Sequence, residues 1–489
     1  MSLPRRRSIQ AASAYGALVL GAITLFLIIR SYGETLTAPA PGAPSVAAAL
    51  ETQAPLARPA QVISREVVPD ALWHLLIALT AVVIAGRLLG RGFSFIGQPP
   101  VIGEVVAGIV LGPSLLGRLA PDVYLYILPP AVAPFLGVVA QLGVILYMFL
   151  VGLDLNPDLL RRHVHATIAT SHASIVVPFV LGTALALHLY PRLSTSDVPF
   201  TNFALFLGVA MSITAFPVLA RILSDHGMTR TDLGTIALTC AAVGDVTAWC
   251  LLAFVVGVAQ ARIESALLVA ALTVTFIGVM FAGVRPIAAR VTRSGDRDPT
   301  QGAIALTLVC LLIAALTTEA IGVHAIFGAF LFGAVIPHDS TLSGALKQSL
   351  ENVVTILLLP AFFAFTGMRT QIGLVSGSYE WFACGLIMVV ATTGKFGGTL
   401  LAARSTGLSW RYAAGLGVLM NTRGLMELIV LNVGLDLGVI SPTLFTMLVL
   451  MALMTTIATT PILRRLVPVS ERAVPAPSRS STARRPEIR

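Results

Sequence analysis

Charged residues are scarce in this sequence. Asp, Glu, Lys and Arg make up only 11% of its 489 residues, whereas soluble domains contain about 25%. So few charges cannot cover a surface that faces water on all sides. The composition therefore excludes an ordinary soluble enzyme or a soluble binding domain.

Cysteine is also rare, and its spacing excludes two kinds of site. The four cysteines lie within apolar runs, without a CxxC pair, at positions Cys240, Cys250, Cys310 and Cys384. This spacing indicates neither a zinc site nor a disulfide framework. We expect no bound cofactor.

Apolar residues, by contrast, make up 56% of the chain and raise its mean hydropathy to +0.88. Apolar runs of about 20 residues recur along the chain, and each is long enough to cross a bilayer. After an opening run at Ile9–Ile29 we expect thirteen further spans, at residues 72–90, 100–118, 132–152, 166–189, 202–224, 234–259, 264–284, 301–318, 322–338, 352–369, 380–404, 411–433 and 441–463. The sequence therefore predicts an all-α polytopic membrane protein with about 13 core transmembrane helices plus one extra N-terminal helix.

This pattern divides the chain into four parts. Residues 1–30 are predicted to form an N-terminal transmembrane helix or signal anchor. The small residues around Ala38–Ala48 leave a cleaved signal sequence as the alternative, but the run is long for a signal and ends in Arg30, which favours a retained helix. Residues 31–70 are rich in Pro and Ala and are expected to form an extracytoplasmic linker. Residues 71–465 hold the transmembrane domain, and residues 466–489 are expected to form a disordered basic cytoplasmic tail near anionic lipid.

Most basic residues lie at the ends of apolar runs, which argues against nucleic-acid binding despite the net charge of +9. With a cytoplasmic N-terminus, 23 of the 32 lysines and arginines fall on the inner side and 7 on the outer side. The positive-inside rule therefore predicts cytoplasmic N- and C-termini in a bacterial-type cell membrane.

Two similar pairs of segments indicate an inverted repeat. Ile102–Gly112 in the second span resembles Ile321–Gly333 in the ninth, and the ends of the third and tenth spans are alike near Gly152 and Gly367. Seven spans separate the members of each pair, and this odd number places the two copies in opposite orientations. Inverted repeats are typical of transporters, although glycine patterns also recur in membrane helices for packing alone.

Five ionisable residues lie deep in predicted spans, where each costs about 2.5–3.5 kcal/mol on insertion scales. They are Glu104, Asp245, Lys395, Arg423 and Glu427. Arg423 and Glu427 are four residues apart on one helix and are expected to neutralise each other. Asp245 has no basic residue within ten positions, so its counter-cation must come from another helix or from solution. Because a desolvated carboxylate can exchange a proton for a metal cation, Asp245 is the candidate binding group.

Lys395 is one of only two lysines in a chain with thirty arginines. A lysine kept at depth favours a group that titrates, because a buried lysine can lose its proton and an arginine cannot. The alternative is that Lys395 is a fixed counter-charge for Asp245.

Two predicted spans contain poor helix centres. Pro217 removes a helical N–H in the middle of its span, and Asn421–Gly424 is a comparably weak segment in the other half of the chain. Irregular backbone at this depth is tolerated only against protein or a wet cavity. Since paired interruptions in corresponding halves indicate a transport site, we expect helix breaks at Pro217 and Gly424.

At these residues the sequence resembles the monovalent cation:proton antiporter-2 family, most closely its plant cation/proton exchangers. The matching stretches occur in the family's order, at Gly97–Gly117, Ser212–Leu223, Ala241–Trp249, Gly394–Gly398 and Met420–Gly434. The resemblance implies the sodium/proton antiporter fold and a homodimer. In that fold each protomer has a panel for dimerisation and a six-helix core, which contains two crossing broken helices and moves like an elevator.

The resemblance also implies roles for single residues. Asp245 matches the family's carboxylate that binds the cation and the proton, so a monovalent cation is the metal expected there. The crossing breaks match Thr214, Ala215, Asn421 and Thr422, and Lys395 matches the membrane-buried base near the site. The other deep charges, Arg423, Glu427 and Glu104, are expected from their depth alone to be supporting charges.

One position departs from the family's pattern. Related electrogenic exchangers carry a second acid immediately before the binding aspartate, and electroneutral ones often carry Asn, whereas this chain has Gly244. One carboxylate carries one proton or one monovalent cation. We therefore hypothesise a 1:1 electroneutral exchange of Na⁺ or K⁺ for H⁺.

Two other functions fit the sequence less well. A potassium efflux channel would need a recognisable loop motif for a carbonyl filter, and we find none. An intramembrane aspartyl protease, suggested by the Gly244-Asp245 pair, needs two carboxylates that share a proton, and Glu104 or Glu427 would have to supply the second. The expected partners are a monovalent cation, a proton, the lipid bilayer and a second copy of the chain.

Overall fold

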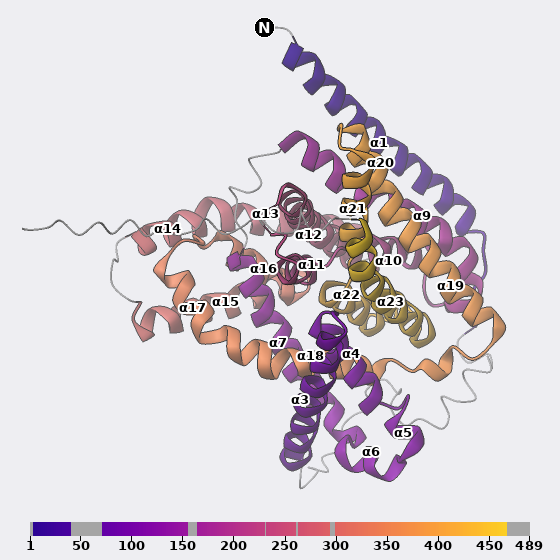
Figure 1. The fold of residues 1–489 in the computed structure, drawn as a ribbon, viewed down its shortest axis with the longest axis vertical. Helices are drawn as coiled ribbons and strands as arrows, with labels where there is room; N and C mark the ends of the chain where they lie inside the picture. Colours follow the sequence, from indigo (N-terminus) through magenta and orange to yellow (C-terminus); the bar gives the residue numbers. More distant parts are fainter. Residues whose placement is uncertain are drawn as a thin grey trace, which may run out of the picture.

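The computed structural model describes residues 3–40, 71–154, 164–229, 231–260, 263–293 and 299–466, and every regular element among them is helical (Figure 1). Twelve helical segments are long and apolar enough to cross a membrane, and the bent pair α21–α22 makes a thirteenth. Helix α16 (Ala325–Val335) is shorter and lies where the sequence predicts the span 322–338. The predicted all-α polytopic fold is confirmed. Residues 41–70 of the linker and 467–489 of the tail lie outside the described residues.

One group of helices packs around α7, and we call this group the panel. Its members are α3 (Ala71–Phe95), α4 (Pro100–Leu111), α7 (Ala133–Asp154), α15 (Gln301–Ile321), α16, α17 (Thr341–Val353) and α18 (Leu359–Arg369). The short helices α5 (Leu116–Leu119) and α6 (Pro121–Ile127) follow α4. Glycines bring the panel backbones together: a Cβ on Gly333 of α16 would lie 2.3 Å from the carbonyl oxygen of Phe149 of α7. Small residues of this kind let membrane helices pack closely.

A second group, which we call the core, packs around α9 and α12. Its members are α9 (Val164–Leu193), α10 (Phe200–Ser212), α11 (Phe216–Asp225), α12 (Asp232–Gln260), α19 (Ser378–Thr392), α20 (Gly398–Ser405), α21 (Trp410–Met420), α22 (Leu425–Asp436) and α23 (Pro442–Leu466). Helices α13 (Ile263–Val279) and α14 (Arg285–Arg293) connect α12 to the panel along the chain. Helices pack more closely within the panel and within the core than between them.

The extra N-terminal helix, α1 (Leu3–Gly33), lies along α9 at the edge of the molecule (Figure 1). Arg30 Nε donates a hydrogen bond of 2.7 Å to Glu34 Oε1 just after the helix ends. The same oxygen accepts a hydrogen bond of 3.0 Å from Thr201 Oγ1 at the start of α10. Helix α1 is therefore attached to the core.

Two core spans are interrupted, as the sequence predicts. Residues 213–215 separate α10 from α11, and residues 421–424 separate α21 from α22, which are bent by 44°. Pro217 is the second residue of α11, where the missing proline N–H removes no helical hydrogen bond. Gly424 immediately precedes α22. Each break therefore lies just before its second half-helix.

Candidate functional site

The two helix breaks lie against each other inside the core. The Ala215 N–H donates to the Thr422 carbonyl at 3.0 Å. Thr214 Oγ1 donates to the Met420 carbonyl at 3.1 Å, although these residues are 206 positions apart. All four residues are buried. These hydrogen bonds satisfy part of the irregular backbone, which would otherwise be costly at membrane depth.

Asp245 lies on α12 beside this crossing, and its side chain is only 4% exposed. Its carboxylate accepts a hydrogen bond from the backbone N–H of Phe216, the first residue of α11. Helix N-termini carry a partial positive charge, so this position favours an anion. Its Oδ2 atom is buried and has no hydrogen-bond partner among the described residues.

The second break carries its own ion pair. Arg423 Nη1 donates to Glu427 Oε2 at 2.7 Å, and neither side chain is exposed. The same guanidinium donates to the carbonyls of Ala210 at 2.8 Å and Met211 at 2.7 Å, which belong to the last turn of α10. Arg423 therefore neutralises both Glu427 and the negative end of the α10 dipole.

Lys395 reaches the same end of α10. It lies in a π-helical turn, Thr393–Gly397, between α19 and α20, and it is fully buried. Its Nζ donates to the Ser212 carbonyl. Asp245 is near enough to interact with Lys395 electrostatically, but the two form no ion pair in the described structure. Lys395 is thus bound to the backbone and acts on Asp245 only at longer range.

Oxygen atoms without partners gather on the elements of this crossing. Besides Asp245 Oδ2, they include Asn421 Oδ1 and Thr422 Oγ1, and all are buried. Buried polar atoms are normally hydrogen-bonded, and oxygen atoms are the ligands that hard cations prefer. Among the described residues no cluster of three or more His, Cys, Asp or Glu has the spacing of a metal site. The unpartnered donors at the crossing are thus oxygen atoms, which suit a hard cation rather than a soft metal.

Glu104 is not among the charges gathered at the crossing. It lies on α4 of the panel, and its Cγ would be 3.6 Å from a Cβ on Gly86 of α3. Arg87, the next residue of α3, interacts with it electrostatically. The structure thus places Glu104 at the α3–α4 contact.

Sequence reasoning missed one residue that fixes the second break. The Arg423 N–H donates to Thr456 Oγ1 at 3.0 Å, and that hydroxyl donates to the Arg423 carbonyl at 2.7 Å. Thr456 lies on α23, in a run that also contains Thr455, Thr459 and Thr460. This cluster of threonines in an apolar span was the available signal, because Ser and Thr hydroxyls satisfy freed backbone groups in membranes.

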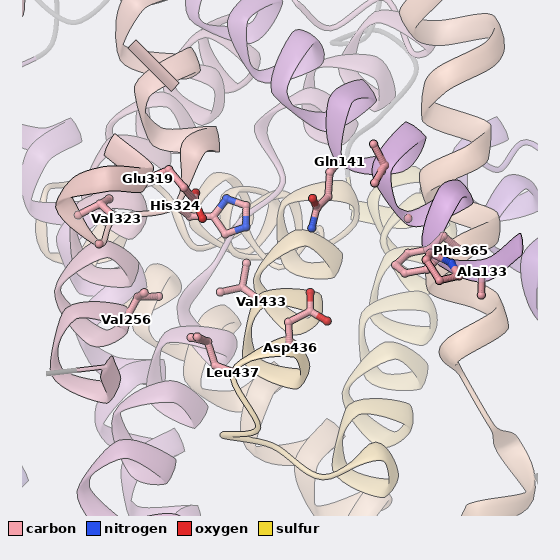
Figure 2. A pocket seen from close by; sticks show the side chains of 14 residues that line it. Ala133, Gln141, Val256, Glu319, Val323, His324, Phe365, Val433, Asp436 and Leu437 are labelled. Atoms are coloured by element: carbon pink, nitrogen blue, oxygen red, sulfur yellow. The ribbon is translucent and has the colours of Figure 1, made fainter. Parts of the chain in front are cut away.

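A cavity of about 390 Å³ opens between the panel and the core. It lies where α15 and α22 end, and we call this the outer end of the molecule because the arginine distribution predicts it to be extracytoplasmic. Figure 2 shows His324 beside Glu319, with Gln141 facing them across the cavity and Asp436 further along its wall. These residues could not be singled out in the sequence, because polar residues near the ends of spans are ordinary.

Comparison with known proteins gives a consistent result. The family model described as "Sodium/hydrogen exchanger, transmembrane" matches residues 76–467. The chain is 45% identical over 400 residues to the Na(+)/H(+) antiporter NhaS4 of Synechocystis, which covers 81% of this chain and 98% of that protein. It is 40% identical over 402 residues to the cation/H(+) antiporter 20 of Arabidopsis thaliana, covering 79% of this chain and 48% of that protein. The K(+)/H(+) antiporter 1 of Saccharomyces cerevisiae is 34% identical over 403 residues, which cover 80% of this chain and 46% of that protein. The chain thus spans about half the length of the plant and yeast relatives.

A solved structure shares the arrangement of helices. The sodium proton antiporter MjNhaP1 from Methanocaldococcus jannaschii matches with a TM-score of 0.60, covering 80% of this chain and 96% of that one, at 14% sequence identity. At this identity the likeness concerns the fold, and it confirms the fold predicted from the sequence.

Proposed function

The chain belongs to the sodium/hydrogen exchanger family, and we propose that it exchanges a monovalent cation, Na⁺ or K⁺, for a proton across a membrane. Both cations are included because similar relatives are named for each. The relative that the chain matches over nearly its whole length is named a Na(+)/H(+) antiporter. Binding takes place at Asp245, with the oxygens of Thr214, Ala215, Asn421 and Thr422 as neighbouring ligands.

The observation that carries this proposal is a buried carboxylate that forms no direct ion pair among the described residues. Asp245 receives one backbone N–H from Phe216 and keeps a free oxygen, while Arg423 is engaged by Glu427 and Lys395 by the Ser212 carbonyl. A proton or a monovalent cation neutralises such a group, and the two compete for it. The same engagement of Glu427, and the position of Glu104 in the panel, give Asp245 no partner for aspartyl-protease chemistry.

The charge balance supports an electroneutral exchange. Gly244 leaves no second acid beside Asp245, so the site carries one proton in one direction and one cation in the other. The core moves relative to the panel when Asp245 has bound either ion, and the site then carries the same charge in both directions, because a proton and a monovalent cation each add one positive charge. Arg423 and Lys395 stay bound to the end of α10 throughout.

Two further features belong to the proposal. The protein sits in a bacterial-type cell membrane with both termini in the cytoplasm, as the distribution of basic residues supports. It forms a homodimer through the panel, as the family resemblance implies.

Exchange by purified protein in proteoliposomes tests the proposal. Replacing Asp245→Asn is expected to reduce cation-driven proton flux to the level of protein-free vesicles, while the protein remains folded. Asp197→Asn, at an exposed acid outside the crossing, is the matched control and is expected to leave the flux unchanged. Flux near the original rate in Asp245→Asn would overturn the assignment.

The same vesicles test the stoichiometry and the channel alternative. A 1:1 exchanger is expected to keep its rate when an imposed membrane potential is changed, and to move no cation without an opposing proton movement. A strong response to potential would overturn electroneutrality. Cation flux that needs no pH gradient would indicate a channel.

A further inference from the structure

A polar bridge joins the panel to the core at the outer end of the molecule. Arg369, the last residue of panel helix α18, forms an ion pair with Asp436, the last residue of core helix α22, with Nη2 2.6 Å from Oδ1. Its Nη1 donates to Asn432 Oδ1, one turn earlier on α22, at 3.0 Å. One guanidinium therefore holds two residues of the half-helix that follows the second break.

Asn432 carries a second connection to the panel. Its Nδ2 donates to Thr366 Oγ1 of α18 at 2.9 Å, and the residue is only 7% exposed. The Arg369 guanidinium also lies 5.2 Å from the centre of the Phe365 ring, one turn earlier on α18. The bridge thus has a buried neutral part, Asn432–Thr366, and a more exposed charged part, Arg369–Asp436.

In the described part of the chain, two other ion pairs lie within a single group of helices. Lys347 pairs with Asp154 between two panel helices at 2.5 Å, and Arg423 pairs with Glu427 inside the core. The Arg369 bridge instead crosses the boundary between the groups, beside the outer cavity, whose wall includes Phe365 and Asp436. A displacement of the core along the panel must break it.

We propose that Thr366, Arg369, Asn432 and Asp436 form an interdomain latch that favours the conformation in which the outer cavity is open. The inference rests on the proposed function, because it assumes that the core moves relative to the panel. The side chains of Arg369 and Asp436 are 23% and 48% exposed, so water screens their attraction and the latch biases the conformational equilibrium without locking it. Weakening the latch shifts the population away from the outer-open state.

The rate at which a thiol in the cavity reacts reports this population directly. Gln141 is exposed and faces the cavity (Figure 2), so Gln141→Cys is introduced after replacement of the four native cysteines. The protein is placed in lipid nanodiscs, which leave both faces accessible, and a charged maleimide is added. Adding Arg369→Gln is expected to slow modification by about twofold to fivefold, the range for a partly exposed ion pair.

Two further variants separate the latch from general damage. The charge reversal Arg369→Asp with Asp436→Arg is expected to return the modification rate toward that of the parent. Arg192→Gln is the matched control, since Arg192 also lies near the outer end but stacks on Tyr379 within the core, 4.2 Å from its ring centre. This control is expected to leave the rate unchanged.

Modification that is unchanged or faster in Arg369→Gln overturns the latch. So does a charge reversal that leaves the rate at the Arg369→Gln value. Thiol modification needs no ion exchange, so the two proposals fail separately. If exchange survives in Asp245→Asn and Arg369→Gln slows modification, the site assignment is overturned and the latch is supported. If Asp245→Asn abolishes exchange and Arg369→Gln does not slow modification, only the latch is overturned.

Discussion

The two helix junctions of the core share a backbone plan and differ in charge. At the end of α10, Arg423 and Lys395 donate to the last carbonyls. At the corresponding end of α21, the Met420 carbonyl accepts a hydrogen bond from the neutral hydroxyl of Thr214. One negative helix end is therefore neutralised by two resident cations, and the other is contacted by a neutral donor.

The acids at the two junctions differ in the same way. Glu427 lies in the first turn of α22 and is paired with Arg423. Asp245 receives the N–H of Phe216 at the start of α11 and has no ion-pair partner among the described residues. Both acids are buried at a helix N-terminus, so burial alone does not distinguish them. The lack of a direct ion pair does, and it makes Asp245 the better candidate for exchange.

Removing the resident cation of the paired acid is expected to have the largest effect. Arg423→Ala leaves Glu427 buried without its partner and removes two hydrogen bonds to α10, at an expected cost of about 3–5 kcal/mol in unfolding free energy. The measurement is the thermal unfolding midpoint in detergent. Arg192→Ala serves as the control, and an unchanged midpoint in Arg423→Ala would show that the pair does not stabilise the crossing.

Substitutions of Lys395, the second positive side chain at the end of α10, test its two interpretations. Lys395→Met leaves the Ser212 carbonyl without its donor, with an expected cost of about 1–3 kcal/mol and slower exchange in proteoliposomes. Because Nζ binds a backbone carbonyl, we expect a fixed charge to suffice, so Lys395→Arg should restore part of the exchange that Lys395→Met loses. No recovery in a folded Lys395→Arg protein would favour a lysine that titrates during transport.

Replacing Thr214, the neutral donor at the end of α21, is expected to have a smaller effect on stability. Thr214→Val removes the hydrogen bond to the Met420 carbonyl and should cost about 0.5–1.5 kcal/mol in unfolding free energy. Because Thr214 is also a proposed neighbour of the cation, the cation concentration for half-maximal exchange should rise. Thr214→Ser keeps the hydroxyl and is the matched control. Equal behaviour of the two variants would remove Thr214 from the site.

An exposed acid with a fixed partner gives the smallest expected effect. Hydrogen bonds from Arg30 and then Thr201 hold the pKa of Glu34 below its usual value of 4.5. The stabilisation is therefore present above pH 4.5 and is lost as the pH falls through the lower, folded-state pKa. Glu34→Gln is expected to leave the unfolding midpoint nearly unchanged at pH 7. A change as large as that in Arg423→Ala would contradict the contrast between buried and exposed pairs.

Much of this architecture was readable from the residues themselves. The interruptions near Pro217 and Asn421 were predicted because proline and weak helix formers disrupt an apolar span wherever it folds. The pairing of Arg423 with Glu427 followed from their spacing of four residues. The Ser212 carbonyl as the partner of Lys395 did not follow, since a backbone acceptor 183 positions away leaves no mark in the sequence.

The sequence by itself determined the helical spans, their interruptions and the set of charges at depth, because hydropathy and local helix geometry depend on neighbours along the chain. Only the tertiary structure decided which charges meet. It placed Glu104 in the panel, bound Lys395 and Arg423 to the end of α10, and left Asp245 with a free oxygen. It also joined Arg369 to Asp436 across the panel–core boundary. Such long-range partners are selected by how packed helices satisfy every polar group at depth, and that condition acts on the whole fold at once.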